Sequence, residues 1–138
     1  MELPDILATQ SLANQLAQQA WSGKTLYLQG DLGAGKTTFV QAFLRALGYE
    51  GHVKSPTYTL LETYALSKLT VHHFDLYRIA DPEELEWLDM RACFTADALV
   101  IIEWPEKGQG FLPAPDITLQ FAYQDTQRTV TMIPSLIM

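Results

Sequence analysis

The sequence has little cysteine, few basic residues and no long apolar run. Cys93 is the only cysteine, which excludes an internal disulfide and is most simply a small buried thiol. Nine Lys and Arg stand against sixteen Asp and Glu, so the formal net charge is −7. Nucleic-acid binding depends on basic residues that meet phosphates. We therefore expect this chain not to bind RNA or DNA tightly on its own.

The apolar segments are shorter than the roughly 20 residues that a membrane-spanning helix needs. The first residues also lack the basic region of a signal peptide, because Lys24 is the first Lys or Arg. From Ile6 to Trp21, apolar residues recur at helical spacing without basic neighbours, which favours a core-facing helix over a membrane-surface helix. We expect a cytoplasmic protein that does not associate with membranes, and the single cysteine fits a reducing compartment.

The chain has 138 residues, of which 48% are hydrophobic and 18% are charged. This composition is typical of one compact globular domain, and no internal repeat or low-complexity tract interrupts it. We therefore expect a single domain over residues 1–138. It is too short to carry a large lid or a separate substrate domain.

The segment Gly30 to Thr37 fits the P-loop pattern Gly-x-x-x-x-Gly-Lys-[Ser/Thr]. It lies between a β-type run, Thr25 to Gln29, and a helical pattern from Lys36 to about Leu47 that Gly48 would close. In such loops, glycines let backbone N–H groups point at phosphate oxygens, and the helix N-terminus adds its positive dipole end. The pattern and its context predict a nucleoside triphosphate site, the alternative being a glycine-rich turn that binds nothing.

Lys36 would reach the β and γ phosphates, and the Thr37 hydroxyl would bind the Mg²⁺ that bridges them. Thr57 follows Ser55-Pro56 in a loop placed where a switch segment approaches the γ-phosphate, although an ordinary turn hydroxyl is an equal alternative. The residues that we expect to bind the nucleotide are Asp31, Leu32, Gly33, Ala34, Gly35, Lys36, Thr37, Thr38 and Thr57.

Hydrolysis needs an acid at a strand end to hold Mg²⁺ and a group that orients the attacking water. Glu103 follows the most hydrophobic strand pattern and is our first choice for the metal, directly or through water. Asp75 follows another β-type run and could hold water or the outer shell of the metal. The alternatives are a solvated Glu103 and an Asp75 satisfied by a turn or by Arg78. The predicted catalytic residues are thus Lys36, Asp75 and Glu103.

His72 and His73 adjoin this region, but neighbouring residues on a strand point to opposite faces and no second ligand pair follows. A zinc site is therefore disfavoured, and each ring is interpreted as a structural histidine with satisfied hydrogen bonds. Trp104 is interpreted as a packing residue, with a partner anchor as the alternative.

The remaining patterns predict an α/β fold, a single P-loop NTPase-like domain with a mixed parallel and antiparallel sheet flanked by helices. Asp81 is typical of an N-cap, followed by Pro82 and by a helix to about Leu88. The run Ala98 to Ile102 indicates a buried strand that Pro105 ends. An antiparallel hairpin and a late pair of edge strands are predicted from four further runs, Tyr58 to Ala65 with Leu69 to Tyr77, and Ile117 to Tyr123 with Thr129 to Ile133.

Five phrases, in this order along the chain, resemble the TsaE (YjeE) family, and the resemblance runs from the first helix to about Tyr123. They are Gly30 to Thr37, Lys54 to Leu60, His73 to Arg78, Asp81 to Leu85 and Glu103 to Gly108. The resemblance implies a bacterial Mg²⁺-dependent ATPase that supports synthesis of threonylcarbamoyladenosine beside the tRNA anticodon. It also implies that the chain binds a TsaD–TsaB heterodimer and meets tRNA only through that complex. TsaE-like proteins do not transfer the threonylcarbamoyl group themselves, and TsaC makes its adenylate donor.

The matching phrases also imply roles for single residues. Where relatives commonly have glycine, this chain has Asp89 or Met90, and it ends soon after Ser135, which puts a local turn and the C-terminal element in doubt. The implied roles are phosphate and Mg²⁺ binding for Lys36 and Thr37, a switch-like loop for Thr57, hydrolysis for Asp75, Mg²⁺ binding for Glu103 and an important aromatic position for Trp104.

Three other functions are alternatives to a slow ATPase. A GTPase is disfavoured, because Asn14 is the only asparagine and the guanine-reading phrase Asn-Lys-x-Asp is therefore absent. A small-molecule kinase would need an acceptor pocket and an arginine-bearing lid, for which the chain offers little length. A regulatory switch whose nucleotide state changes partner affinity agrees with slow hydrolysis and stays open.

Overall fold

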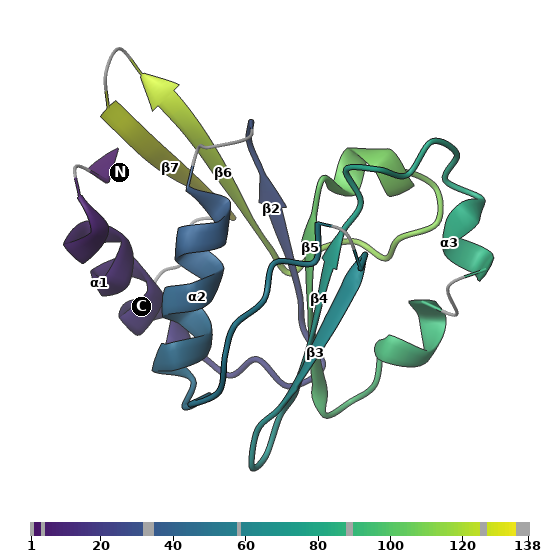
Figure 1. Cartoon of the computed structure of the whole chain (residues 1–138), viewed down its shortest axis with the longest axis horizontal. Helices are drawn as coiled ribbons and strands as arrows, with labels where there is room; N and C mark the ends of the chain where they lie inside the picture. The colour runs from purple at the N-terminus through teal and green to yellow at the C-terminus, as the bar shows by residue number, and fades with distance from the viewer. Residues whose placement is uncertain are drawn as a thin grey trace.

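The computed structural model describes residues 2–3, 5–31, 35–57, 59–87, 90–124 and 127–134. Within these residues the chain forms one mixed seven-stranded sheet in the order β1-β7-β6-β2-β5-β4-β3, with helices on both faces (Figure 1). The elements in chain order are β1 (Glu2–Leu3), α1 (Ile6–Ala17), β2 (Thr25–Gln29), α2 (Lys36–Ala46), β3 (Leu61–Ala65), β4 (Thr70–Asp75), α3 (Glu84–Trp87), the 3₁₀ helix η1 (Met90–Cys93), β5 (Ala98–Glu103), the 3₁₀ helix η2 (Pro105–Gly108), β6 (Ile117–Gln124) and β7 (Gln127–Ile133).

The centre of the sheet is parallel, so the carboxyl ends of its strands lie at one edge. β2 pairs in parallel with β5 on one side and with β6 on the other, and β4 pairs in parallel with β5. The outer pairs β3–β4, β6–β7 and β1–β7 are antiparallel. The segment that follows β2 therefore leaves the sheet between the ends of β5 and β6, at the edge where open α/β sheets bind ligands.

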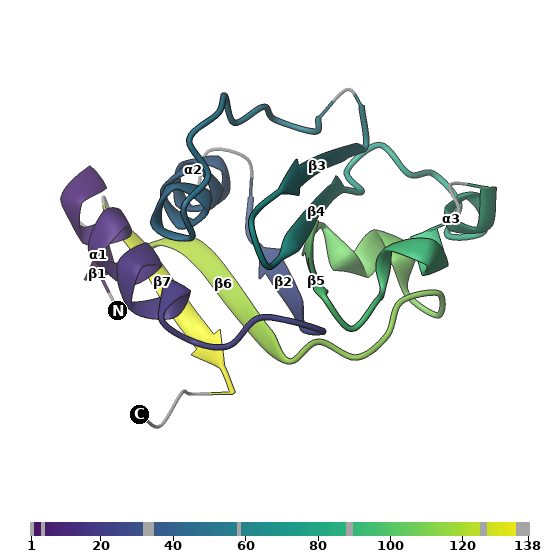
Figure 2. The same cartoon turned by 90° about the horizontal axis from the view of Figure 1, so that it is seen from below.

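β5 is buried along its whole length, because both faces of the sheet are covered. Leu99 and Ile101 belong to the apolar cluster under α1 and α2, whereas Val100 and Ile102 belong to a second cluster with Leu85 of α3. Figure 2 shows α1 and α2 on one side of the sheet and the segment around α3 on the other. Burial on both faces explains why the sequence of β5 is continuously apolar and does not alternate.

The C-terminal ends of the two long helices, α1 and α2, are each explained by the residues that follow them. α1 ends at Ala17, before the end of the helical pattern, and Trp21 turns back so that its indole N–H donates to the Leu16 carbonyl at 2.7 Å. After α2, Gly48 has a φ of +106°, the left-handed conformation in which glycine commonly follows a helix. The predicted close of α2 at Gly48 is therefore confirmed.

The predicted α/β fold with a mixed sheet is confirmed, and so are its two antiparallel pairs, β3–β4 and β6–β7. The prediction that the last two strands form an edge is wrong in part. β6 pairs in parallel with β2 and so belongs to the centre of the sheet, while β1 covers the outer side of β7. A two-residue strand such as β1 carries no pattern that sequence reasoning could detect.

The helix predicted after Asp81 is shorter than expected, because regular α-helix begins only at Glu84. The capping contacts nevertheless form. The Asp81 carboxylate accepts from the Glu83 N–H at 3.0 Å, and the Glu84 carboxylate accepts from the Asp81 N–H at 3.0 Å. The predicted end at Leu88 and the family departure at Asp89 lie outside the described residues. No helix in the described ranges is long and apolar enough to cross a bilayer.

Candidate functional site

The P-loop leaves β2 at Gly30, a position that only glycine fits. Its φ is +140°, and a Cβ at this position would overlap the carbonyl oxygen of Phe121 on β6. Gly35 also has a positive φ, +111°, and serves as the N-cap of α2. The predicted phosphate-binding residues between them, Leu32, Gly33 and Ala34, lie outside the described residues.

Lys36 is the first residue of α2, and its side chain is directed to the same edge of the sheet. Its ammonium donates to the Gly30 carbonyl at 2.6 Å and lies 4.1 Å from the centre of the Trp104 ring. Burial lowers the pKa of Lys36, while the negative charges of Glu103 and Asp75 oppose that shift. The lysine predicted to bind phosphate is therefore a partly desolvated cation facing two acids.

The other predicted residues of the first turn differ in exposure. Thr37, the predicted Mg²⁺ ligand, is exposed, and Thr38 is half-buried. Asp31 is exposed just after Gly30, and its charge also acts on Lys36. A hydroxyl on an exposed first turn is free to meet a ligand from solvent.

Asp75 is the last residue of β4, is only 6% exposed and accepts two hydrogen bonds through its carboxylate. Oδ1 accepts from the Tyr77 N–H at 3.0 Å, and Oδ2 accepts from the Thr57 hydroxyl at 3.3 Å. The Thr57 hydroxyl also lies 2.7 Å from that of Ser55. The predicted switch-like loop is thus tied to the predicted hydrolytic acid, and the turn contact that we considered as an alternative for Asp75 is present too.

Glu103 is the last residue of β5 and is 4% exposed, so it is not the solvated glutamate of the alternative interpretation. It lies directly across the β4–β5 ladder from Asp75. Its Oε2 lies 2.6 Å from Nε2 of His73, which is 2% exposed. The register of two parallel strands therefore brings the two predicted acids together.

His72 and His73 point to opposite faces, as expected for neighbours on a strand. His72 bonds through Nδ1 to the Thr63 hydroxyl at 3.0 Å, and burial lowers its pKa. His73 departs from the expectation of a fully satisfied ring, because its buried Nδ1 has no hydrogen-bond partner among the described residues. The same part of the chain contains no group of three His, Cys, Asp or Glu side chains placed to hold a metal.

Trp104 is more than the packing residue that the sequence suggested. Its φ of +58° is unusual for a residue other than glycine, and its ring lies against Tyr77 with 5.0 Å between ring centres, as well as near Lys36. Sequence reasoning missed this contact with Lys36 and the contact between His73 and Glu103. In the sequence, the only signal for Trp104 is its position next to Glu103, and the only signal for His73 is its position two residues before Asp75.

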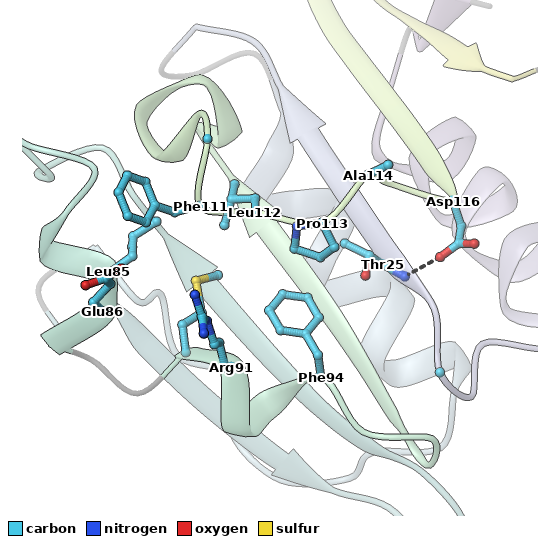
Figure 3. Close-up of a pocket in the computed structure, with 13 residues that line it drawn as sticks. Thr25, Leu85, Glu86, Arg91, Phe94, Phe111, Leu112, Pro113, Ala114 and Asp116 are labelled. Carbon is cyan, nitrogen blue, oxygen red and sulfur yellow. Dashed lines mark hydrogen bonds between the residues drawn. The ribbon is translucent and has the colours of Figure 1, made fainter.

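A pocket of about 930 Å³ lies away from this edge (Figure 3). One wall includes Thr25, the first residue of β2, whose N–H donates to the Asp116 carboxylate at 2.8 Å. Phe94, Phe111 and Leu112 add apolar surface. Because the P-loop follows the other end of β2, this pocket is separate from the candidate nucleotide site.

Comparison with known proteins identifies the family. Residues 3–130 match the family described as "Threonylcarbamoyl adenosine biosynthesis protein TsaE". A protein from Haemophilus influenzae, named tRNA threonylcarbamoyladenosine biosynthesis protein TsaE, is 52% identical over 108 residues, which cover 78% of this chain and 68% of that protein. A protein of the same name from Synechocystis is 41% identical over 109 residues, which cover 76% of this chain and 69% of that protein.

The fold is likewise similar to a solved structure, the crystal structure of Bacillus subtilis YdiB. The two superpose with a TM-score of 0.73 at 27% sequence identity, over 96% of this chain and 82% of YdiB. The matched residues 3–130 contain the P-loop, both acids and most of the sheet. The chain therefore belongs to the TsaE family of threonylcarbamoyl adenosine biosynthesis proteins.

Proposed function

We propose that this chain binds Mg²⁺·ATP at the P-loop edge of the sheet and hydrolyses it slowly, in support of tRNA threonylcarbamoyladenosine synthesis. The observation that carries the proposal is the Lys36 ammonium at the start of α2, on which the carboxylates of Glu103 and Asp75 act from neighbouring strand ends. A cation at a helix N-terminus with acids at adjacent strand ends is the arrangement that phosphoryl-transfer sites require.

The side chains at this edge fit Mg²⁺, which prefers oxygen ligands and usually takes one or two carboxylates together with phosphates. We assign Thr37 and Glu103 as the residues that would hold it. When bound, Mg²⁺ would neutralise charge on the phosphate oxygens. Lys36 would supply a second positive charge to the β and γ phosphates, and its partial burial strengthens that interaction relative to water.

Asp75 would orient the attacking water. One of its oxygens accepts from the Thr57 hydroxyl, so a displacement of that loop would free an acceptor for the water. The Thr57–Asp75 contact also favours a second function, a nucleotide-dependent switch, because it links a surface loop to the hydrolytic acid. In that case slow turnover would time an interaction with a partner.

The proposed partner is the TsaD–TsaB heterodimer, with tRNA bound only through the resulting complex. Family membership supports this assignment, and so does the formal net charge of −7, which disfavours direct contact with the tRNA backbone. This chain would not transfer the threonylcarbamoyl group itself. A partner residue could complete the site, since an added arginine is worth ~10³ to 10⁵ in rate where NTPases use one.

The test is to measure ATP binding and turnover for the wild type and the variants Lys36→Ala, Asp75→Ala and Glu103→Ala. Each is assayed alone, with TsaD–TsaB, and with TsaD–TsaB and tRNA. We expect Lys36→Ala to lose binding or turnover, and the two acid variants to keep binding while losing about 100-fold or more in turnover. Wild-type ATP affinity in Lys36→Ala would refute the site, and a phosphorylated small-molecule product would identify a kinase.

A further inference from the structure

His73 and Glu103 form a buried pair behind the candidate nucleotide site. The imidazole Nε2 lies 2.6 Å from Glu103 Oε2, and the two side chains are only 2% and 6% exposed. His73 is on β4 and Glu103 ends β5, so the contact joins two parallel strands beside the residue pair Asp75 and Glu103. A carboxylate so far from solvent needs a donor, and this imidazole supplies one.

The surroundings of the ring indicate which nitrogen carries the proton. His73 Nδ1 is buried and has no hydrogen-bond partner in the described part of the chain. A proton there would be a buried donor without an acceptor, which costs more than leaving a lone pair unmatched on a neutral ring. The favoured arrangement is therefore one in which His73 Nε2–H donates a short hydrogen bond to Glu103 Oε2, while Nδ1 carries no proton.

This bond fixes the orientation of Glu103. With Oε2 held by His73, the carboxylate can offer its other oxygen to a ligand at the strand end. His73 itself is buried and lies two residue pairs further from that end, because it lies across from Ile101 while Asp75 lies across from Glu103. Donors of this kind behind a metal-binding carboxylate usually matter about 10- to 100-fold in metal affinity or activity.

We infer that His73 is a positioning residue that orients Glu103 toward the divalent cation of the bound nucleotide. The inference rests on the proposed function, because it assumes that Glu103 meets the cation. A merely structural role, in which His73 only compensates a buried charge, would affect folding stability and leave cation affinity unchanged.

The experiment measures Mn²⁺ binding to the full chain with ADP by electron paramagnetic resonance, for the variants His73→Gln and His73→Leu. Gln can place an amide donor near Glu103, whereas Leu cannot. We expect Mn²⁺ affinity to fall about 10- to 100-fold in His73→Leu and to recover in part in His73→Gln. ADP affinity without metal should change less than threefold in both. His72→Leu, on the opposite face of β4, is the matched control and should keep wild-type Mn²⁺ affinity.

A folded His73→Leu variant with wild-type Mn²⁺ affinity would overturn the inference. Nitrogen-detected NMR of the wild type tests it without any substitution, and protonated Nε2 with unprotonated Nδ1 is expected. A proton on Nδ1 alone would also overturn it. If the wild type binds neither ADP nor Mn²⁺, the proposed function fails, and the tautomer measurement still decides whether His73 donates to Glu103.

Discussion

At the scale of single residues, Lys36 is held by two groups of different chemistry. The Gly30 carbonyl oxygen accepts a hydrogen bond from the Lys36 ammonium at 2.6 Å, and the centre of the Trp104 ring lies 4.1 Å from the same nitrogen. A cation over an aromatic ring gains about 0.5 to 2 kcal/mol, depending on desolvation. Phosphate oxygens would compete for the same ammonium, so nucleotide binding must displace or share these contacts. Trp104 therefore bears on the chemistry of the lysine as well as on packing.

The lowered pKa of Lys36 predicts proton uptake when ATP binds at alkaline pH. Burial holds this pKa below its usual 10.5 in the free chain, and bound phosphates would raise it again. Between the two pKa values, the free lysine is largely neutral and the bound lysine is charged. Binding should then take up at most about one proton, and ATP affinity should fall up to about tenfold per pH unit above the free-chain pKa.

Calorimetry in two alkaline buffers of different ionisation enthalpy measures this uptake directly. Lys36→Arg is the control, because a guanidinium stays protonated throughout the range and should show no uptake. Uptake in Lys36→Arg equal to that of the wild type would assign the proton to another group.

At the scale of elements, the close approach of β2 and β6 determines how the P-loop leaves the sheet. Gly30→Ala should destabilise the fold by about 3 kcal/mol, through a Cβ that meets the Phe121 carbonyl and a φ of +140° that L-residues resist. Gly48→Ala is the matched control, since its φ is +106° and no atom lies within 4 Å of a Cβ there. In Gly48→Ala only backbone strain should act, and it should lower the free energy of unfolding by about 1 kcal/mol. Thermal unfolding should show shifts of about 10 °C and 3 °C, and equal shifts would contradict the backbone clash.

The strand order also predicts on which side of the P-loop the nucleoside lies. The acids assigned to the γ-phosphate and its cation lie on β4 and β5, so the nucleoside should extend toward β6 and β7 on the other side of β2. The Arg128 side chain lies there, with Cδ 3.8 Å from where a Cβ on Gly35 would be, and its Nε donates to the Tyr123 hydroxyl at 3.2 Å. Guanidinium and phenol groups both stack on bases.

Arg128→Ala should therefore weaken ATP binding about tenfold, at the low end of about 1 to 3 kcal/mol per stacked base. Binding of inorganic tripolyphosphate, which has no nucleoside, should stay within about twofold of the wild type. Competition against a fluorescent nucleotide measures both ligands. The control is Arg45→Ala, an exposed arginine in the last turn of α2. Equal loss for ATP and tripolyphosphate would make Arg128 a phosphate ligand instead.

The elements that sequence reasoning predicted well are those whose signal is local. The helix that begins at Lys36, the apolar run of β5 and the hairpin residues each carry their own pattern, and the matching elements α2, β5 and β3–β4 formed. Predictions were incomplete where strand register decides the outcome. The pairing of β6 with β2 and the contact of His73 with Glu103 depend on which strands lie side by side, and no spacing along the chain encodes that.

At the scale of the whole molecule, nearly all the chemistry that we assign lies at one edge of one sheet. The Thr57–Asp75 bond connects that edge to a surface loop, which a partner could contact. The large pocket at the opposite end of β2 is lined by other residues, so occupation of one region does not block the other. Under the proposed function, nucleotide bound at this edge would set the affinity of the chain for a partner that contacts the loop.

We predict that ATP and the TsaD–TsaB heterodimer strengthen each other's binding to this chain. If the loop at Thr57 changes position when Asp75 and Lys36 meet the γ-phosphate, the bound and free chains present different surfaces, and coupling of about 5- to 150-fold is typical. Thermodynamic linkage requires that ATP raise the affinity for TsaD–TsaB by the same factor by which TsaD–TsaB raises the affinity for ATP.

Two calorimetric titrations measure this factor. Titration of TsaD–TsaB with the wild type, with and without a non-hydrolysable ATP analogue, gives the change in TsaD–TsaB affinity, and analogue binding with and without TsaD–TsaB gives the change in analogue affinity. Lys36→Ala should show no coupling, while Thr57→Val should keep analogue binding and lose much of the coupling. Identical TsaD–TsaB affinity with and without the analogue would rule out the switch and leave a chain whose turnover alone serves the assembly.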